Sequence, residues 1–116
     1  MIYGSHAALS AMNGFSKTMA VAANNIANAS SSGFKKSRVV LEEGQNGEVE
    51  TYVQEVDVDI PILSEETSVE QTKEASNVDI SEEMVYMVNA QLGYEANLKS
   101  LQAQEELQGS ILDILG

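Results

Sequence analysis

The feature that most constrains this chain is an apolar repeat near each end, with a polar stretch between the two. In the first repeat, apolar residues recur at alternating steps of four and three from about Ser5 to Asn28, the spacing of a coiled-coil seam along one face of a helix. Gly14 and several Asn, Ser and Thr residues lower the helix propensity of the segment. We therefore expect a helix that depends on packing for its order, with the seam formed by Ala8, Met12, Phe15, Met19, Ala22 and Ile26.

The second repeat predicts a longer helix over residues 79–116. Asp79 can cap this helix, and Glu82 lies three residues later, which is capping-box spacing with Asp in place of Ser or Thr. Glu82 and Glu83 in the first turn also suit the positive end of the helix dipole. The expected stripe consists of Ile80, Met84, Met87, Gln91, Tyr94, Leu98 and Leu101, and then shifts around Gly109 to Leu107, Ile111 and Ile114.

The length of this second helix argues against a compact domain. A helix over residues 80–115 would extend about 54 Å at roughly 1.5 Å per residue, whereas a compact domain of this size has a radius of gyration of about 13 Å. The first helix, at about 36 Å by the same rise, can cover only part of the second. We expect an elongated molecule with apolar helix surface left over for other subunits.

The polar middle predicts a helix stop followed by a small β element. Gly33 ends the run of Ser after the first helix and is expected at positive φ. Residues 34–41 are β-like, and Asn46-Gly47 is a strong hairpin signal. A strand of alternating apolar and mostly acidic residues is then predicted, which Pro61 places at an edge or at its end; its members are Glu55, Val56, Asp57, Val58, Asp59, Ile60, Pro61 and Ile62.

These elements divide the chain into four parts and indicate a mainly α fold with a small β element. We expect an elongated pair of N- and C-terminal coiled-coil-like helices joined by a short β-hairpin region. The parts are an N-terminal axial helix and linker, a small β-hairpin region, a polar exposed connection and a long C-terminal axial helix, over residues 1–33, 34–63, 64–78 and 79–116.

Charge is divided unevenly along the chain. The formal charge is −12, from 18 acidic and 6 basic residues. Residues 1–38 contain no acid but hold Lys17, Lys35, Lys36 and Arg38. The remaining acidic surface would repel phosphate, so nucleic acid is not expected as a partner. Between stacked subunits, the basic segment is expected to face the Glu-rich surface of a neighbour.

The chain offers little for catalysis or metal binding. It has no Cys and a single His6, which cannot supply the ligands of a zinc site, and it contains no P-loop, dinucleotide fingerprint or HExxH motif. Glu55, Asp57 and Asp59 are interpreted as a solvated strand edge that blocks aggregation, with a Ca²⁺-binding module as a weaker alternative. We predict no enzyme activity, no catalytic residue, no cofactor and no metal.

The chain shows no sign of membrane insertion. The N-terminal residues lack the basic start and apolar run of a Sec-type signal peptide. No segment approaches the roughly 18 apolar residues of a membrane span. If the protein leaves the cytoplasm, we expect a route without a cleaved signal.

Two motifs carry a family resemblance. Residues 23–28, Ala-Asn-Asn-Ile-Ala-Asn, followed by Gly33-Phe34-Lys35, resemble the N-terminal signature of bacterial flagellar rod and hook proteins. Residues 76–84, Ser-Asn-Val-Asp-Ile-Ser-Glu-Glu-Met, with Tyr94-Glu95-Ala96-Asn97 after them, resemble the C-terminal signature of the same family. Two departures stand out: Ser30-Ser31-Ser32 replaces the usual Thr or Thr-Pro, and the middle of the chain is short. The chain is therefore similar to a short, proximal-rod-like member.

The resemblance implies a structural subunit of the flagellar basal-body rod that self-assembles through its terminal helices and serves motility. Its expected partners are copies of itself, other flagellar rod or hook proteins and the flagellar type III export apparatus, without a cleaved signal peptide. The alternative is a non-axial adaptor or regulatory protein that binds a rod or export component. The residues expected at the assembly interface are Met12, Phe15, Met19, Asn24, Asn25, Ile26, Asn28, Gly33, Phe34, Met84, Met87, Tyr94, Leu98 and Leu101.

The three Asn residues near the end of the first helix have two interpretations. For Asn28, capping of the last carbonyls is favoured, because an Asn amide can satisfy them and Asn tolerates left-handed geometry. Asn24 and Asn25 lie a turn inside the helix, so capping competes evenly with bonds to another subunit or to the loop at Gly33-Phe34. Phe34 is expected to fill a core position.

Overall fold

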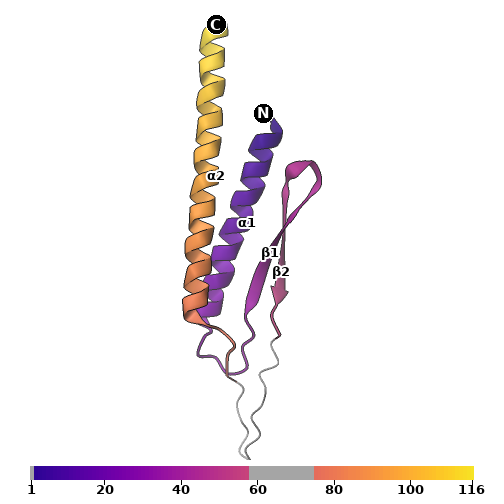
Figure 1. Cartoon of the computed structure of the whole chain (residues 1–116), viewed down its shortest axis with the longest axis vertical. Helices are drawn as coiled ribbons and strands as arrows, with labels where there is room; N and C mark the ends of the chain where they lie inside the picture. Colours follow the sequence, from indigo (N-terminus) through magenta and orange to yellow (C-terminus); the bar gives the residue numbers. More distant parts are fainter. Residues whose placement is uncertain (1, 58–74) are drawn as a thin grey trace, which may run out of the picture.

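Two antiparallel helices of unequal length form the body of the molecule, and a two-stranded hairpin lies along the shorter one (Figure 1). The computed structural model describes residues 2–57 and 75–116. Its Cα radius of gyration is 20.9 Å, well above the about 13 Å of a compact domain of this length. The predicted elongated, mainly α fold is confirmed, with elements α1 (Ile2–Ala27), β1 (Ser37–Glu43), η1 (Gln45–Gly47), β2 (Val49–Glu55) and α2 (Ile80–Leu115).

Helix α1 ends where the Asn and Ser residues begin to bond their own backbone. The Asn28 side chain donates to the Asn24 carbonyl at 2.9 Å, so Asn28 satisfies one of the last helical carbonyls, as predicted. Gly33 follows at φ +70°, a conformation that favours glycine because it has no Cβ. The predicted stop of the first helix is therefore confirmed.

Helix α2 begins at the predicted cap and runs for 36 residues. The Asp79 carboxylate accepts hydrogen bonds from the backbone N–H groups of Ser81 and Glu82 at 2.9 and 3.3 Å. The Glu82 side chain pairs with Lys36 and Arg38, so it takes part in contacts outside a capping box. The Asp79 carboxylate thus caps the start of the helix, and the Glu82 carboxylate ties the first turn to Lys36 and Arg38.

The two helices pack antiparallel, with Asn25 beside Glu83 at one end and Ser5 bonded to Gln104 at the other. On α1, the predicted seam faces inward at its buried positions Ala8, Met12 and Ala22. The inward face of α2 differs from the predicted stripe. Glu83 and Ala90 are buried there, whereas the predicted Ile80, Met84 and Leu98 are exposed.

Glycine sets how closely the helices approach. A Cβ at Gly93 would lie 2.5–2.8 Å from three ring atoms of Phe15, so the ring packs directly against the backbone of α2. A second contact, between Asn25 and Glu83, lies ten residues away on each helix. The two contacts together fix the rotation of α2 about its own axis. The apolar period alone could not reveal it, because neither Gly93 nor Glu83 is an apolar core residue by type.

The hairpin has the predicted turn but a different second strand. Asn46 and Gly47 both have positive φ, at 62° and 76°, and strands β1 and β2 pair antiparallel from Ser37 with Glu55 to Glu43 with Val49. The expected strand from Glu55 onward is therefore wrong at its start. Val56 and Asp57 follow the end of β2, because the turn starts the strand at Val49, and residues 58–63 lie outside the described part of the chain.

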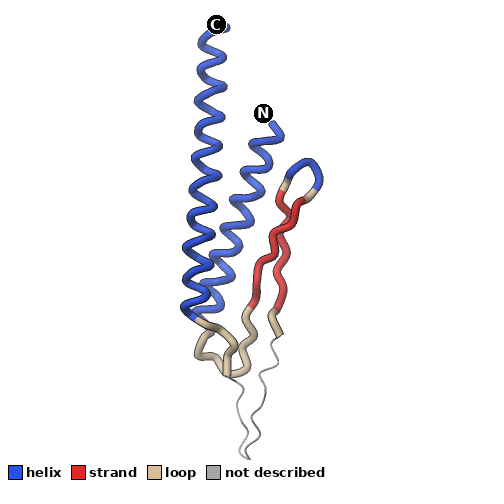
Figure 2. Tube along the Cα trace, viewed as in Figure 1, coloured by secondary structure: helices blue, strands red, loops and turns tan. Residues whose placement is uncertain are grey.

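The hairpin rests on α1, as the two strands drawn beside that helix in Figure 2 show. The Val49 N–H donates to the Ser10 hydroxyl at 2.9 Å. A Cβ at Gly14 would come within 2.7 Å of a Leu41 methyl group. Helix α1 therefore lies between α2 and the hairpin and touches both.

Two glycines of α2 give a matched test of this packing. Gly93→Ala should lower the free energy of unfolding by about 1 kcal/mol, because overpacking against Phe15 costs about 1–3 kcal/mol and outweighs the helix-propensity gain. Gly109→Ala meets no atom within 4 Å and should raise it by roughly 0.5–1 kcal/mol. Urea denaturation measures both. Equal stabilisation by the two substitutions would contradict the described contact.

Candidate functional site

A buried amide joins the three parts of the fold. Asn25 of α1 is 1% exposed. Its Nδ2 donates to the Ser37 carbonyl at 2.8 Å and to the Glu83 carboxylate at 3.0 Å, and its Oδ1 accepts from the Ser37 N–H at 3.0 Å. The side chain thus pairs with Ser37 as a neighbouring strand would. One residue connects α1, β1 and α2.

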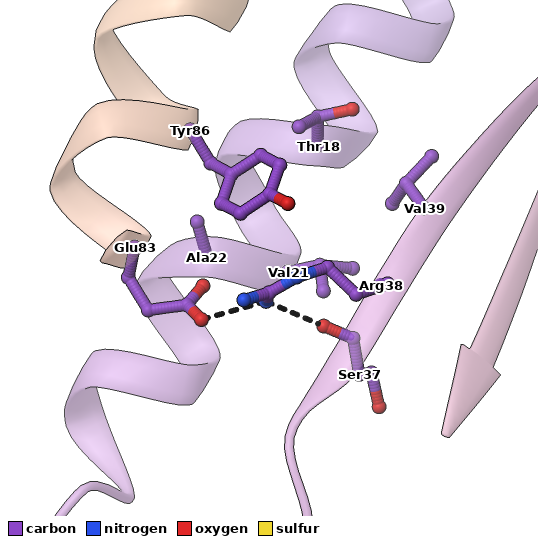
Figure 3. Close-up of a pocket in the computed structure, with 8 residues that line it drawn as sticks. All are labelled: Thr18, Val21, Ala22, Ser37, Arg38, Val39, Glu83 and Tyr86. Carbon is purple, nitrogen blue, oxygen red and sulfur yellow. Dashed lines mark hydrogen bonds and ion pairs between the residues drawn. The ribbon is translucent and has the colours of Figure 1, made fainter. Parts of the chain in front are cut away.

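A buried ion pair lies beside this amide (Figure 3). Glu83 of α2 is 0% exposed, and its Oε1 lies 2.6 Å from Nη1 of Arg38 on β1. The same Arg38 nitrogen donates to the Ser37 carbonyl at 3.2 Å. The guanidinium also lies over the Tyr86 ring, 4.3 Å from its centroid, within cation–π range. The contacts of Arg38 with Glu83 and Tyr86 tie β1 to the start of α2.

Glu82 adds a second, more exposed layer of charge pairing. Its Oε2 lies 2.7 Å from Lys36 Nζ and 3.2 Å from Arg38 Nη2. The hydrogen bond from Lys36 and that from Arg38 lower the pKa of Glu82, although partial burial opposes them. Burial by itself would lower the pKa of Arg38, but hydrogen bonds and charges from Glu83 and Glu82 raise it. Both groups therefore stay charged near neutral pH.

A second amide, that of Asn77, bonds backbone groups at the base of the hairpin as Asn25 does. Asn77, just before α2, accepts from the Lys36 N–H at 2.6 Å and donates to the Val56 carbonyl at 2.8 Å. Its own N–H donates to the Phe34 carbonyl at 3.3 Å. Asn77 therefore holds both ends of the hairpin against the start of α2. We call Asn25, Ser37, Arg38, Asn77, Glu82 and Glu83 the junction cluster.

The space at the ion pair of the junction cluster is small. The cavity between Arg38, Glu83, Tyr86 and α1 measures about 20 Å³, space for about one water molecule. Across residues 2–57 and 75–116, no three His, Cys, Asp or Glu side chains gather as metal ligands would. Neither described helix contains an apolar stretch long enough to cross a membrane. The arrangement is suited to holding segments together.

The basic segment pairs with acidic residues of its own chain. Lys35 lies 3.4 Å from Asp57, and Lys36 and Arg38 pair with α2 of the same chain. These three cations therefore have partners inside the chain, and a contact with a neighbouring subunit stays a prediction for them. Their sequence neighbours gave no sign of this, because the partners lie about 20 to 46 residues away. Lys17 stands apart on the exposed surface of α1.

The structure divides the predicted interface residues into three groups. Met12 and Asn25 are buried within the chain. Eight are half-buried: Phe15, Met19, Ile26, Asn28, Phe34, Met87, Tyr94 and Leu101. Four are exposed and accessible to another molecule: Asn24, Gly33, Met84 and Leu98. A role of these residues between subunits stays a prediction.

Helix α2 extends beyond the level at which α1 covers it. The last contact described between the two helices joins Ser5 and Gly4 to Gln104. After Gln104, the larger apolar side chains of α2 are 45–83% exposed, and Figure 1 shows this end projecting past the N-terminus of α1. The exposed residues are Leu107, Ile111, Leu112, Ile114 and Leu115; we call them the open end of α2.

Two protein-family models match the two halves of this arrangement. Residues 6–35, which contain most of α1 and Asn25, match the flagella basal body rod protein model. Residues 70–114, which contain Asn77, Glu83 and nearly all of α2, match the flagellar basal body rod FlgEFG protein C-terminal model. The chain belongs to the flagellar basal body rod protein family. This is a structural family of the flagellum, and the family assignment predicted from the sequence is confirmed. No curated protein matches the chain.

The motifs of this rod family protein contain the amides of the junction cluster. Asn25 belongs to the first motif and Asn77 to the second, and the sequence offered both without showing that they bond backbone groups of the hairpin. Of the junction cluster, only Asn25 was among the predicted site residues; Ser37, Arg38, Asn77, Glu82 and Glu83 were missed. The signal that could have found them is the charge of Arg38 next to a strand, together with two carboxylates in the first turn of the second helix.

Removal of the cation from the junction cluster should be costly. Arg38→Ala leaves the Glu83 carboxylate buried without its cation, and breaking a buried pair in this way costs about 3–5 kcal/mol of unfolding free energy. Lys17→Ala, at an exposed position, should change it by no more than about 0.5 kcal/mol. Chemical denaturation of both variants measures the difference.

The double variant Arg38→Leu with Glu83→Leu tests whether the cost of Arg38→Ala comes from the unpaired Glu83 carboxylate. It removes both charges together, so its stability should return most of the way to that of the wild type. If Arg38→Ala behaves like Lys17→Ala, the ion pair does not hold the junction together.

Proposed function

We propose that this protein is a structural subunit of the bacterial flagellar rod, which assembles by packing its helices against those of neighbouring subunits. The observation that carries the proposal is the open end of α2. By helical period, Leu112 and Leu115 continue the inward-facing line of Leu101 beyond Gln104, which bonds Ser5 of α1. An apolar line that outlasts its partner in the same chain is suited to a helix of another subunit.

The junction cluster supports the same function by holding the helices in one arrangement. Its bonds tie the start of α2 to α1 and to the hairpin, so the open end projects in a fixed direction. Burying one Leu side chain contributes about 1.5–3 kcal/mol. The residues of the open end together offer enough apolar surface for association without any catalytic group.

The expected partners are other rod or hook subunits and further copies of this chain. The expected place is the basal body of the flagellum. Export would use the flagellar type III apparatus, without a cleaved signal peptide, and the helical N-terminal segment would be recognised in that step. The proposal includes no enzyme activity, no cofactor and no metal.

A substitution in the open end tests the proposal. Leu112→Asp places a charge where an apolar contact is expected, so it should weaken association at least about tenfold, the equivalent of about 1.4 kcal/mol. Leu112 is 69% exposed, so the free energy of unfolding should change by only about 0.5 kcal/mol. Ser110→Asp adds the same charge on another side of the helix and is the matched control. Sedimentation velocity reports association in vitro.

The same variants in cells distinguish a rod subunit from an adaptor. Deletion of the gene should prevent completion of the rod, seen by electron microscopy of purified basal bodies. Wild type and Ser110→Asp should restore it, and Leu112→Asp should not. Complete rods in the deletion strain, with the protein absent from purified basal bodies of the wild type, would contradict a structural role and favour a non-axial adaptor or regulatory protein.

A further inference from the structure

Helix α2 has a second apolar face, which α1 does not cover. The side chains of Met84, Val85, Val88 and Leu92 are 57–60% exposed. The residues that face α1 over the same turns are Glu83 and Ala90, at 0% and 3% exposure. At 100° per residue the two sets lie on nearly opposite sides of the helix. We call the four exposed residues the outer stripe of α2.

Helix α1 has an exposed face of small residues at matching positions. Ser16, Ala20, Ala23 and Ala27 are exposed and follow one another at steps of four, three and four, the spacing of one helix face. Beside this face, a shallow groove of about 240 Å³ runs between α1 and the hairpin and is lined in part by Ala20, Asn24 and Val53. We call Ser16, Ala20, Ala23 and Ala27 the small-residue face of α1.

The two surfaces stand at the same height in the molecule. Phe15 contacts Gly93, and Asn25 contacts Glu83, so both helices advance ten residues between these levels. Ala20 is therefore level with Val88. By the same count, three pairs share a level: Ser16 with Leu92, Ala20 with Val88 and Ala23 with Val85.

We propose that the outer stripe of α2 in one copy of this chain packs on the small-residue face of α1 in a second copy, side by side and without axial shift. This inference rests on the proposed rod function and names the contact between copies. Large side chains at Leu92, Val88 and Val85 meet small ones at the same levels, so the helices can approach closely with the spacing of ridges and grooves. The groove beside Ala20 leaves additional room for the Val88 side chain of the second copy.

Charge favours this pairing over contact between identical faces. Helix α1 contains no acidic residue and carries Lys17 beside the small-residue face. On α2, Glu82 and Glu83 are already paired with Lys36 and Arg38, whereas the exposed Glu95 lies on the side of the outer stripe. Two outer stripes facing each other would bring like charges together, whereas α1 beside α2 brings opposite charges together.

The geometry of the contact also fits an axial structure. The stripe and the small-residue face are different surfaces of the same chain, so the contact is heterologous and a pair joined by one contact keeps one stripe and one small-residue face open. Such contacts generate a ring when the rotation closes and a helical array when it does not. Such a pair can accept a third copy as long as the rotation does not close the pair on itself.

Cross-linking can test the contact cleanly, because the chain has no Cys. The double variant Ala23→Cys with Val85→Cys is oxidised at concentrations where the protein associates. We expect a ladder of disulfide-linked dimers and higher species on non-reducing gels, and dimers when the two single variants are mixed. The matched control, Ala23→Cys with Tyr52→Cys on the exposed hairpin, should yield several-fold less cross-linked product. Circular dichroism checks that each variant is folded.

Each outcome distinguishes the contact from the wider function. Cross-linking of Val85→Cys alone would show outer stripes facing each other and would overturn the inference. Association that persists with no link between positions 23 and 85 would overturn it and leave the rod function standing. Val88→Glu supplies a second variant: association should fall at least several-fold while Gln102→Glu, elsewhere on α2, has no effect. An unchanged association in Val88→Glu would also overturn the contact.

Discussion

Asn25 joins three parts of the chain with one side chain, and the rest of the fold depends on that connection. A single amide inside α1 satisfies both backbone groups of Ser37 and reaches the buried Glu83 carboxylate. Buried polar groups without partners are costly, so an arrangement that gives the Asn25 amide and both Ser37 backbone groups their partners is favoured. That arrangement sets the direction of α2 and therefore the direction of its open end.

Local patterns predicted the elements better than the contacts between them. The Asp79 cap, the stop at Gly33 and the turn at Asn46-Gly47 depend on neighbouring residues, and all three agree with the structure. The inward face of α2 was offset because Gly93 and Glu83, which set its rotation, do not look like core residues. The second strand lies earlier than predicted, because the turn at Asn46-Gly47 pairs Val49 with Glu43 and the alternation after Glu55 does not reflect that register.

The site was predictable as a set of motif residues but not as a network. Asn25 was expected to cap, bond the nearby loop or reach another subunit, yet it bonds Ser37 and Glu83 of its own chain. The basic residues Lys36 and Arg38 are neutralised by α2 in the same way. Long-range polar pairing leaves no periodic trace in a sequence. The apolar side chains of the open end of α2 remain accessible to other molecules.

The junction is closed within one chain, while the far end of α2 is open to partners. Amide hydrogen exchange of the monomeric protein, resolved by residue, tests both halves at once, because protection follows the free energy of local opening. The Ser37 amide, bonded to Asn25, should exchange as slowly as the central amides of α1, and the amides around Leu112 should exchange much faster. Rapid exchange at Ser37, or slow exchange at Leu112 in the monomer, would contradict the account.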